Sequence, residues 1–360
     1  MSFDSFEIDP ALLAGVRDLG FEQPTDIQQD AIPWALEGRD VLACAMTGSG
    51  KTAAFGLPIL HRLLDGPRGV ARALILSPTR ELASQIEEHL TQLGAHTHVR
   101  VASIYGGVAY EPQEKAFREG YEILVATPGR LLDHLRRPYA RLDRLEVLVL
   151  DEADRMLDMG FIPDVRRIVA QVPSERQTLF FSATLASPIV RLAGDMLRDP
   201  VTINLERRSL PAAGVRQAAY PVRHELKPAL LLHLLQKHPV GSALVFTRTR
   251  ERADQVGEYL RRAGEKAAVI HGDRTQQHRS RAMDEFKQGR YRVLVATDVA
   301  ARGIDIEELD LVVNLDVPSA PEDYIHRVGR TARAGSTGDA WTFVAARELA
   351  DLHLIEKSIG

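Results

Sequence analysis

Residues 45–52 have the composition and spacing needed to hold phosphate groups. They read Ala-Met-Thr-Gly-Ser-Gly-Lys-Thr, after an apolar run and before a helical pattern. Glycines allow backbone N–H groups to surround phosphate oxygens, and the helix N-terminus adds its partial positive charge. Lys51 would reach the β- and γ-phosphates, and the Thr52 hydroxyl would ligate Mg²⁺. Ala45 departs from the general form of this loop, which begins with Gly.

A second segment could supply the chemistry of hydrolysis. The apolar run 147–150 ends at Asp151 and Glu152. Asp151 would hold Mg²⁺, directly or through water, and Glu152 would orient and deprotonate the attacking water. Taken alone, these acids could be a solvated helix start with Asp154 as a cap. Beside a phosphate loop, the hydrolytic interpretation is favoured.

Bulk properties limit the class of protein. A chain of 360 residues exceeds one ordinary core, so two domains are expected. No apolar run approaches the length of a membrane span, and the first residues lack the basic start of a signal peptide. Cys44 is the only cysteine, which fits a cytoplasmic location. The net charge of −4 does not indicate a nucleic-acid binder, so any polyanion site must be local.

The two halves of the chain repeat each other. Residues 73–86 and 243–256 are identical at seven of 14 positions at an offset of 170. The same offset maps 124–127 onto 294–297, and an offset near 166 maps 104–107 onto 270–273. Three matches in the same order predict a duplicated domain. Each half alternates short apolar runs with helical patterns, which predicts an α/β fold with a mainly parallel sheet flanked by helices in each half.

Strand and linker positions follow from these patterns. Residues 206–216 lose the apolar periodicity, so we expect domains at 1–207 and 217–360 with a flexible linker at 208–216. Ligands of parallel sheets bind at the carboxyl ends of strands, where nearly every motif here lies. Helices are expected near 79–93, 186–197, 249–263 and 276–288. Strands are expected near 41–45, 73–77, 99–105, 123–126, 146–150, 178–182, 217–222, 242–246, 267–270, 293–296, 311–315 and 339–344.

With Asp-Glu-Ala-Asp at 151–154 and its other motifs in order, the chain resembles the DEAD-box ATP-dependent RNA helicases along nearly its whole length. Segments 244–250 and 158–162 resemble most closely the bacterial RhlE-type branch. The resemblance implies two tandem RecA-like domains. It also implies RNA-stimulated ATP hydrolysis, coupled to domain closure and to local unwinding of short RNA duplexes or remodelling of RNA–protein complexes.

The resemblance assigns roles around the nucleotide. In the segment 20–28, which looks like the family's Q motif, Gln28 would read adenine, and this implies ATP; alone, Gln28 would be taken for a surface residue. Segment 182–184 would couple hydrolysis to closure, although its hydroxyls could also cap a helix starting near 187. In 326–333, Arg330 and Arg333 would reach the γ-phosphate on closure, although three arginines in eight residues could form a basic surface loop. Ala332 stands where the family usually has Gly.

The catalytic residues expected are Lys51, Asp151, Glu152, Ser182, Thr184, His326, Arg330 and Arg333, and the Mg²⁺ ligands are Thr52 and Asp151. The nucleotide contacts expected are Phe3, Phe21, Thr25, Gln28, Ala45, Met46, Thr47, Gly48, Ser49, Gly50, Lys51, Thr52, Gly303, Asp305, Arg330 and Arg333.

Both halves repeat Thr-Arg at the end of an apolar strand, at 79–80 and at 249–250. Hydroxyls, arginines and helix N-termini at strand ends suit phosphate and sugar contacts. The resemblance assigns these segments to single-stranded RNA, and the scarcity of base-reading groups predicts sequence-independent, salt-sensitive binding. Each residue alone could instead serve a turn or a helix cap. The RNA contacts expected are Pro78, Thr79, Arg80, Gly106, Gly107, Thr127, Pro128, Gly129, Arg130, Thr249, Arg250, Gly272 and Thr297.

Two other functions share most of these residues. A DNA translocase of the wider helicase superfamily 2 would keep the phosphate loop and the arginine motif. An ATP-gated RNA clamp would keep everything and unwind nothing. The Q motif and the run 78–83 favour an RNA helicase, with RNA and ATP as its partners and no role at a membrane.

Overall fold

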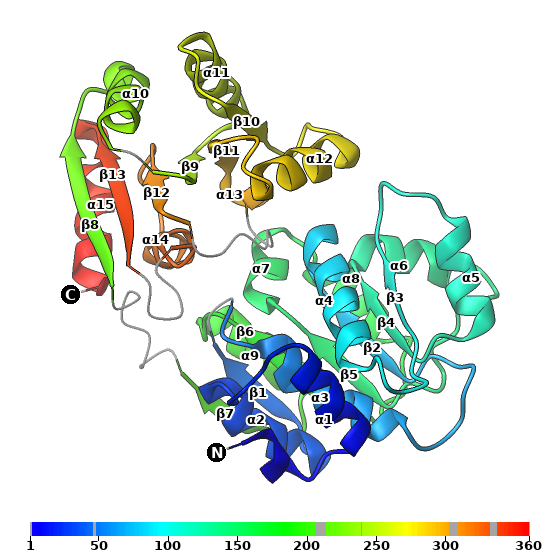
Figure 1. Ribbon diagram of the computed structural model, residues 1–360. Helices are drawn as coiled ribbons and strands as arrows, with labels where there is room; N and C mark the ends of the chain where they lie inside the picture. Colours follow the sequence, from blue (N-terminus) through cyan, green and yellow to red (C-terminus); the bar gives the residue numbers. More distant parts are fainter. Residues whose placement is uncertain are drawn as a thin grey trace. The chain divides into compact units, whose positions relative to one another are not determined.

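A computed structural model describes residues 2–45, 48–205, 214–238, 240–301, 309–331 and 337–359 (Figure 1). The chain divides into two compact units, Met1–Arg208 and Ser209–Gly360. The predicted residues Met46, Thr47, Gly303, Asp305 and Arg333 lie outside the described residues, as does most of the expected linker. In the described part of the chain, every helix is too short or too polar to span a membrane.

The first unit is built on a parallel sheet with the strand order β3-β4-β2-β5-β6-β1-β7. Its central strands are short, apolar and buried, because helices cover both faces. The bounds are β1 (Val41–Cys44), β2 (Ala73–Leu76), β3 (Val101–Ile104), β4 (Ile123–Ala126), β5 (Val147–Leu150), β6 (Gln177–Ser182) and β7 (Val201–Asn204).

Two hydrophobic cores lie on opposite faces of this sheet. Along β1, Val41 and Ala43 join one core while Leu42 joins the other, as the two-residue period of a strand requires. The first core packs against the helices up to α4, and the second packs against α5 to α9. The bounds are η1 (Phe3–Phe6), α1 (Pro10–Asp18), α2 (Asp26–Leu36), α3 (Lys51–Leu63), α4 (Arg80–Leu93), α5 (Glu111–Glu119), α6 (Pro128–Leu135), α7 (Ala153–Asp158), α8 (Ile162–Val169) and α9 (Ser187–Met196).

The second unit repeats this plan. Its sheet has the order β10-β11-β9-β12-β13-β8. The first five strands in this order correspond one by one to β3-β4-β2-β5-β6 of the first unit, and β8 takes the place of β1. The strands are β8 (Val215–Pro221), β9 (Ala243–Thr247), β10 (Ala267–Ile270), β11 (Val293–Thr297), β12 (Leu311–Asn314) and β13 (Gly338–Val344). The helices are η3 (His224–Leu226), α10 (Lys227–Lys237), α11 (Arg250–Arg262), α12 (Gln276–Lys287), α13 (Asp298–Ala301), α14 (Pro321–Val328), η4 (Ala346–Glu348) and α15 (Leu349–Ile359).

Two strand positions differ from the sequence-based expectation. β7 was not predicted, because its run Val-Thr-Ile-Asn mixes polar and apolar residues. It lies at the sheet edge, pairs only with β1 among the described residues and needs only one buried face. β8 starts at Val215, inside the segment expected to be linker. The remaining expected strands have counterparts, and the two α/β units have the architecture predicted from the repeat.

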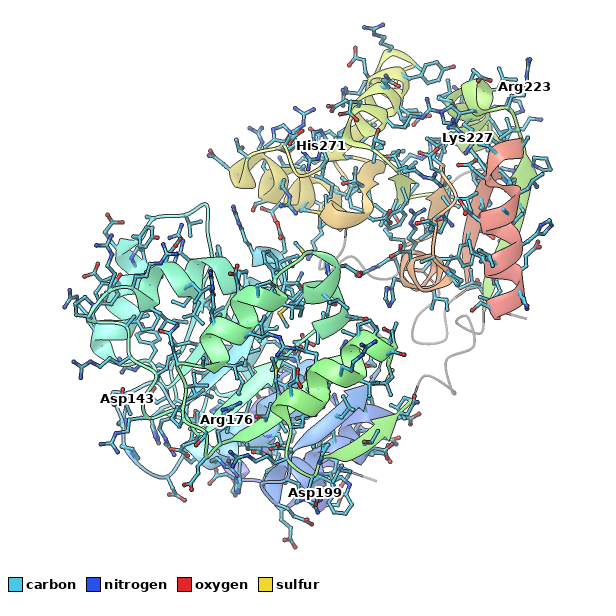
Figure 2. The ribbon with its side chains drawn as sticks, turned by 180° about the vertical axis from the view of Figure 1, so that it is seen from behind. Asp143, Arg176, Asp199, Arg223, Lys227 and His271 are labelled. Atoms are coloured by element: carbon cyan, nitrogen blue, oxygen red, sulfur yellow. The ribbon has the colours of Figure 1, made fainter. Side chains whose placement is uncertain are left out.

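A buried lysine joins three elements of the second unit. Lys227, the first residue of α10 (Figure 2), is fully buried. Its Nζ lies 2.7 Å from the Leu315 carbonyl oxygen, 2.6 Å from Glu348 Oε2 and 3.5 Å from Asp316 Oδ1. Buried charges cost several kcal/mol each unless they are paired and hydrogen-bonded. This cluster therefore fixes α10 against the end of β12 and against η4.

Replacing this lysine tests the cluster. Lys227→Met leaves two buried carboxylates without their cation, so we expect it to lower the free energy of unfolding of the second unit by about 3–5 kcal/mol. Urea denaturation followed by the fluorescence of Trp341, in a Trp34→Phe background, reports on that unit because Trp341 is buried in its core. Lys237→Met, at the exposed end of the same helix, is the matched control. An unchanged midpoint in Lys227→Met would contradict the stabilising role.

Candidate functional site

Three neighbouring strands of the first unit deliver the predicted catalytic residues to one edge. β5, β6 and β1 are adjacent and parallel, and Cys44 at the end of β1 is in register with Ser182 at the end of β6. Lys51 begins α3 beyond β1, and Asp151 follows β5. Lys51 Nζ donates to the Ala45 carbonyl oxygen at 3.2 Å and lies 4.0 Å from Asp151 Oδ1. The structure therefore brings together residues 100 positions apart in the sequence.

The described part of the phosphate loop fits an anion. Gly48 and Gly50 have φ angles of 77° and 92°, which favour glycine. A Cβ at Gly50 would lie 2.5 Å from Gln28 Nε2. Ser49 Oγ is buried and has no hydrogen-bond partner among the described residues. An unsatisfied hydroxyl at the start of a helix is suited to a phosphate oxygen.

Asp151 fits a cation. Its side chain is buried, and its Oδ1 accepts the backbone N–H of Glu152 at 3.0 Å. Burial is the main effect that raises the pKa of Asp151 to about 6, although Lys51 acts against the shift. A bound metal ion would relieve this cost by favouring the charged carboxylate. Thr52, on the first turn of α3, is the second predicted ligand.

Glu152 is held by a residue that sequence reasoning missed. Arg155 Nη1 donates to Glu152 Oε2 at 2.7 Å, and both side chains are 7% exposed. Glu152 also has left-handed backbone angles, with φ 49° and ψ 53°, a conformation that costs a non-glycine residue about 1–3 kcal/mol. The spacing of three residues on a helix start was a signal for this pair. The pairing and the strained backbone together fix the Glu152 carboxylate at the edge of the sheet.

Asp154 connects the acidic segment to the end of β6. Its Oδ2 accepts the backbone N–H of Ala183 at 3.2 Å, and the Thr184 N–H reaches Ser182 Oγ at 3.4 Å. α9 begins only at Ser187 and has no side-chain cap. The alternative that the hydroxyls of 182–184 cap this helix is therefore wrong, and the acidic segment contacts the backbone N–H of Ala183.

The Q-motif residues contact the phosphate loop. Gln28 is buried; its Oε1 accepts the Thr25 N–H at 2.9 Å, and its Nε2 donates to the Gly50 carbonyl oxygen at 3.0 Å. Thr25 Oγ1 donates to the Ser49 carbonyl oxygen at 2.7 Å. Gln28 is thus not the surface residue that its helical pattern alone would suggest. Each amide atom of Gln28 keeps one further hydrogen-bonding position, so its contact with adenine stays a prediction.

Phe3 and Phe21, the two aromatic residues among the expected nucleotide contacts, lie together. Phe3 and Phe21 are stacked, with ring centroids 6.3 Å apart and planes at 24°. Phe21 also makes an edge contact with His89 at 5.7 Å. Phe3 is buried in the first core, so its ring supports Phe21 from inside the unit.

The candidate RNA contacts of the first unit surround a glycine loop. Arg80 lies against Gly107, whose φ is 84°, and a Cβ on Gly107 would fall 1.9 Å from Arg80 Nη1. Arg130 lies 4.1 Å from the ring centroid of Tyr110 and donates to the Val108 carbonyl oxygen at 3.2 Å. Two arginines therefore flank the loop 105–110. The structure brings them together from the starts of α4 and α6.

Thr79 and Thr249 cap helices through their side chains, as their alternative interpretation proposed, whereas Thr127 has the N-cap position of α6 without a side-chain hydrogen bond. Thr79 Oγ1 accepts the Leu82 N–H at 3.3 Å, and Thr249 Oγ1 accepts the Arg252 N–H at 3.2 Å. Pro78 precedes Thr79, and Thr127 is the N-cap of α6, followed by Pro128 and the open Gly129. A hydroxyl oxygen that accepts a backbone N–H still has its own hydrogen to donate, so Thr79 and Thr249 can cap a helix and also donate a hydrogen bond to RNA.

In the second unit, Gly272 lies against Arg250 as Gly106 lies against Arg80 in the first. Arg250 Nη1 contacts Asp273 Oδ1 at 2.5 Å, and a Cβ on Gly272 would lie 3.5 Å from Arg250 Nη2. Thr297 ends β11, as Thr127 follows β4. The sequence repeat therefore includes the contact of an arginine with a glycine, but Asp273 stands at the position of Gly107 and pairs with Arg250.

The arginine motif contains an anchor that was not predicted. His326 and Arg327 lie on α14, and Arg330 follows it. Arg327 makes a bidentate ion pair with Asp298, at 2.6 and 2.7 Å, and donates to Asn314 Oδ1 at 3.0 Å. The first arginine of the motif thus fixes α14 to α13 and β12. Arg330, whose backbone N–H bonds to the Arg327 carbonyl oxygen at 3.2 Å, is positioned by it.

Comparisons with known proteins agree with this geometry. Residues 25–192 match the DEAD/DEAH box helicase family, and residues 226–335 match the helicase conserved C-terminal domain. The ATP-dependent RNA helicase CshA of Listeria monocytogenes is 45% identical over 99% of this chain and 68% of its own length. The DEAD-box ATP-dependent RNA helicase CshA of Geobacillus kaustophilus is 43% identical over 99% and 76%. These CshA-type relatives do not support the expected closeness to the RhlE-type branch.

Solved structures show the same fold. Dbp5 of S. cerevisiae bound to RNA and ADP BeF3 aligns with a TM-score of 0.91 at 33% identity, over 100% of this chain and 93% of that one. A DEAD box protein from Methanococcus jannaschii aligns with a TM-score of 0.58 at 39% identity, over 100% and 97%.

The contact between Arg80 and Gly107 can be tested directly. In Gly107→Ala, the new Cβ displaces Arg80 and the backbone is strained, so we expect about tenfold weaker binding of a short single-stranded RNA, the loss of one charge-assisted contact. Gly160→Ala, with a φ of 75° and open space around it, carries the same strain without the clash and is the control. Fluorescence anisotropy measures both affinities. Equally weakened RNA binding in the two variants would show that backbone strain alone causes the effect, and would contradict a role for the contact between Arg80 and Gly107.

Proposed function

The chain belongs to the DEAD-box family of ATP-dependent RNA helicases, and from this premise we propose how its own residues carry out the reaction. ATP is hydrolysed at the carboxyl edge of the first sheet, and the energy is used to separate short RNA duplexes locally or to remodel RNA–protein complexes. The observation that carries the proposal is the buried cluster of Lys51, Asp151 and Glu152 beside the phosphate loop.

In this proposal the loop binds the phosphates. Backbone N–H groups at the start of α3 and the free Ser49 hydroxyl face the phosphate oxygens, and Lys51 supplies positive charge. Thr52 and Asp151 would hold Mg²⁺, which offsets phosphate charge when bound. Gln28 and Thr25, already attached to the loop, would read adenine, with Phe21 against the base and Phe3 behind it.

Glu152 removes the proton from the attacking water. Arg155 holds its carboxylate by a hydrogen bond to Oε2, which orients Oε1. Asp154 transmits the state of this segment to 182–184 through the Ala183 N–H. We propose that these contacts make hydrolysis sensitive to the position of Ser182 and Thr184.

The second unit supplies the remaining parts. Arg330 and Arg333 reach the γ-phosphate when the two units close, His326 contacts the acidic segment, and Gly303 and Asp305 approach the ribose. Closure needs ATP because the γ-phosphate would add a charge that these arginines bind in the closed state. We also keep the domain limits 1–207 and 217–360 and the cytoplasmic location as predictions.

RNA is bound through its backbone across both units. The paired sites around Arg80 and Arg250 each combine an arginine, a helix N-terminus and a glycine at close range. Such contacts bind the phosphate and sugar groups and do not distinguish one base from another. We propose single strands and short duplexes as substrates, with affinity that falls as salt rises.

The role of Glu152 predicts a separation of binding from turnover. In Glu152→Gln the water loses its base, so kcat for ATP hydrolysis should fall by about 10²–10⁴-fold, while the affinities for ATP and RNA change little. Steady-state ATPase assays and equilibrium binding measure the two effects. Glu175→Gln makes the same chemical change at an exposed position of the first unit and should leave both unchanged. Brisk hydrolysis by Glu152→Gln would remove Glu152 from this role.

The function itself is tested with two substrates. RNA should stimulate ATP hydrolysis more than DNA of equal length, and the chain should separate a short RNA duplex only when ATP is present. Stimulation by DNA alone would identify a DNA translocase. RNA-stimulated hydrolysis without strand separation would identify a clamp.

A further inference from the structure

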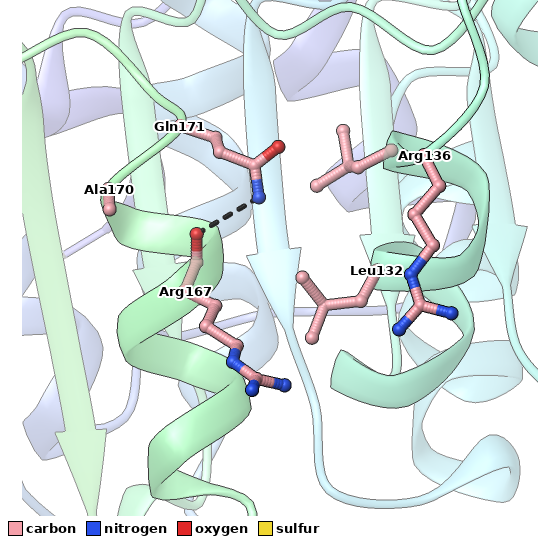
Figure 3. A pocket seen from close by; sticks show the side chains of 6 residues that line it. Leu132, Arg136, Arg167, Ala170 and Gln171 are labelled. Atoms are coloured by element: carbon pink, nitrogen blue, oxygen red, sulfur yellow. Dashed lines mark hydrogen bonds between the residues drawn. The ribbon is translucent and has the colours of Figure 1, made fainter.

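A pocket lies on the first unit between α6 and α8, apart from the predicted nucleotide and RNA residues (Figure 3). Its volume of about 390 Å³ falls within the range of about 300–1,000 Å³ that is common for ligand pockets. The lining residues are Leu132, Leu135, Arg136, Arg167, Ala170 and Gln171.

The pocket combines an apolar floor with two cations. Leu132 and Leu135 are partly buried against the second core, and their remaining surface faces the pocket. Figure 3 shows Arg136 on the α6 side and Arg167 on the α8 side, with Leu132 between them. Gln171 Nε2 donates to the Arg167 carbonyl oxygen at 3.1 Å, which fixes the amide at the rim. An occupant would meet an apolar surface flanked by two guanidinium groups.

Both guanidinium groups are available to an outside carboxylate. Arg136 Nη1 lies 3.7 Å from Asp133 Oδ1, and Arg167 Nη1 lies 3.6 Å from Asp164 Oδ1, distances longer than a hydrogen bond. The arginine side chains are 74% and 68% exposed, and such surface pairs contribute little. A bidentate carboxylate would be a better partner for either arginine.

Further arginines lie in the chain segment that follows α6, next to the pocket. The segment 136–144 contains four arginines and one aspartate, all exposed, in a chain whose net charge is −4. Arg136 and Arg167 also lie near the ends of α6 and α8, where cations complement the helix dipoles. That effect accounts for the positions of the arginines but not for the apolar gap between them.

We propose that this pocket docks a short acidic peptide segment of a partner protein. One bulky apolar side chain of the peptide packs on Leu132 and Leu135, and its flanking carboxylates bind Arg136 and Arg167. None of the six lining residues is aromatic, so the pocket offers no stacking platform for a nucleobase. The opposite end of α6 carries Thr127 to Arg130, so the partner binds the same helix as the predicted RNA contacts without covering them.

The test uses the full chain and a fluorescein-labelled peptide, Glu-Asp-Glu-Phe-Asp-Glu-Asp, followed by fluorescence anisotropy. We expect saturable binding that Arg136→Glu with Arg167→Glu weakens at least tenfold. The matched control is Arg166→Glu, on the same helix but outside the pocket and paired with Asp195 at 2.6 Å; it should change the affinity by less than twofold. Thermal unfolding and ATP hydrolysis, unchanged in all variants, verify that each is folded.

A second probe with Ser in place of Phe separates the pocket from general charge attraction. It should bind at least tenfold more weakly than the first. Equal binding of the two probes, equal binding by the double variant, or no saturable binding at millimolar peptide would overturn the proposal. Loss of oligo(U) binding in the double variant, without peptide binding to the wild type, would assign the surface to RNA instead.

Discussion

Charge buried at the carboxyl edge of the first sheet is the constraint on which the rest of the structure depends. Lys51, Asp151, Glu152 and Arg155 are all buried there because β5, β6 and β1 end side by side. Glu152 and Arg155 are paired at 2.7 Å, although Arg155 Nε and Nη2 have no hydrogen-bond partner among the described residues, and Lys51 and Asp151 stand 4.0 Å apart. An incompletely paired buried ion is expensive. A triphosphate with its cation would complete the pairing, which is why we place the reaction there.

The second unit shows what happens when the protein completes the same arrangement itself. β8 occupies the place of β1, and Lys227 begins the helix after it, as Lys51 begins α3 after β1. Asp316 follows β12, the counterpart of β5. Here, however, the ammonium group is bound by Glu348 at 2.6 Å and by the Leu315 carbonyl oxygen at 2.7 Å. In the second unit the protein itself therefore supplies the partners of this lysine.

Sequence reasoning predicted the parts that depend on local patterns. Buried parallel strands are continuous apolar runs, and the glycines and lysine of the phosphate loop have fixed spacing, so both were recognisable. The edge strand β7 was missed because half of its residues are polar. The pairs of Arg327 with Asp298 and of Lys227 with Glu348 were missed because charged residues far apart in sequence resemble solvated surface until the fold joins them. The hydrogen bond from Gln28 to Gly50 was missed for the same reason, because the two residues are far apart in the sequence.

We propose that ATP and RNA together bring the two units into one closed assembly. Cys44 is buried and is the only cysteine, so dyes attached at Lys115→Cys and Arg262→Cys, both on exposed positions, report the distance between the units. Single-molecule energy transfer should show a shorter distance only when a non-hydrolysable ATP analogue and single-stranded RNA are both present. A distance that is the same with neither, one or both ligands would contradict the coupling.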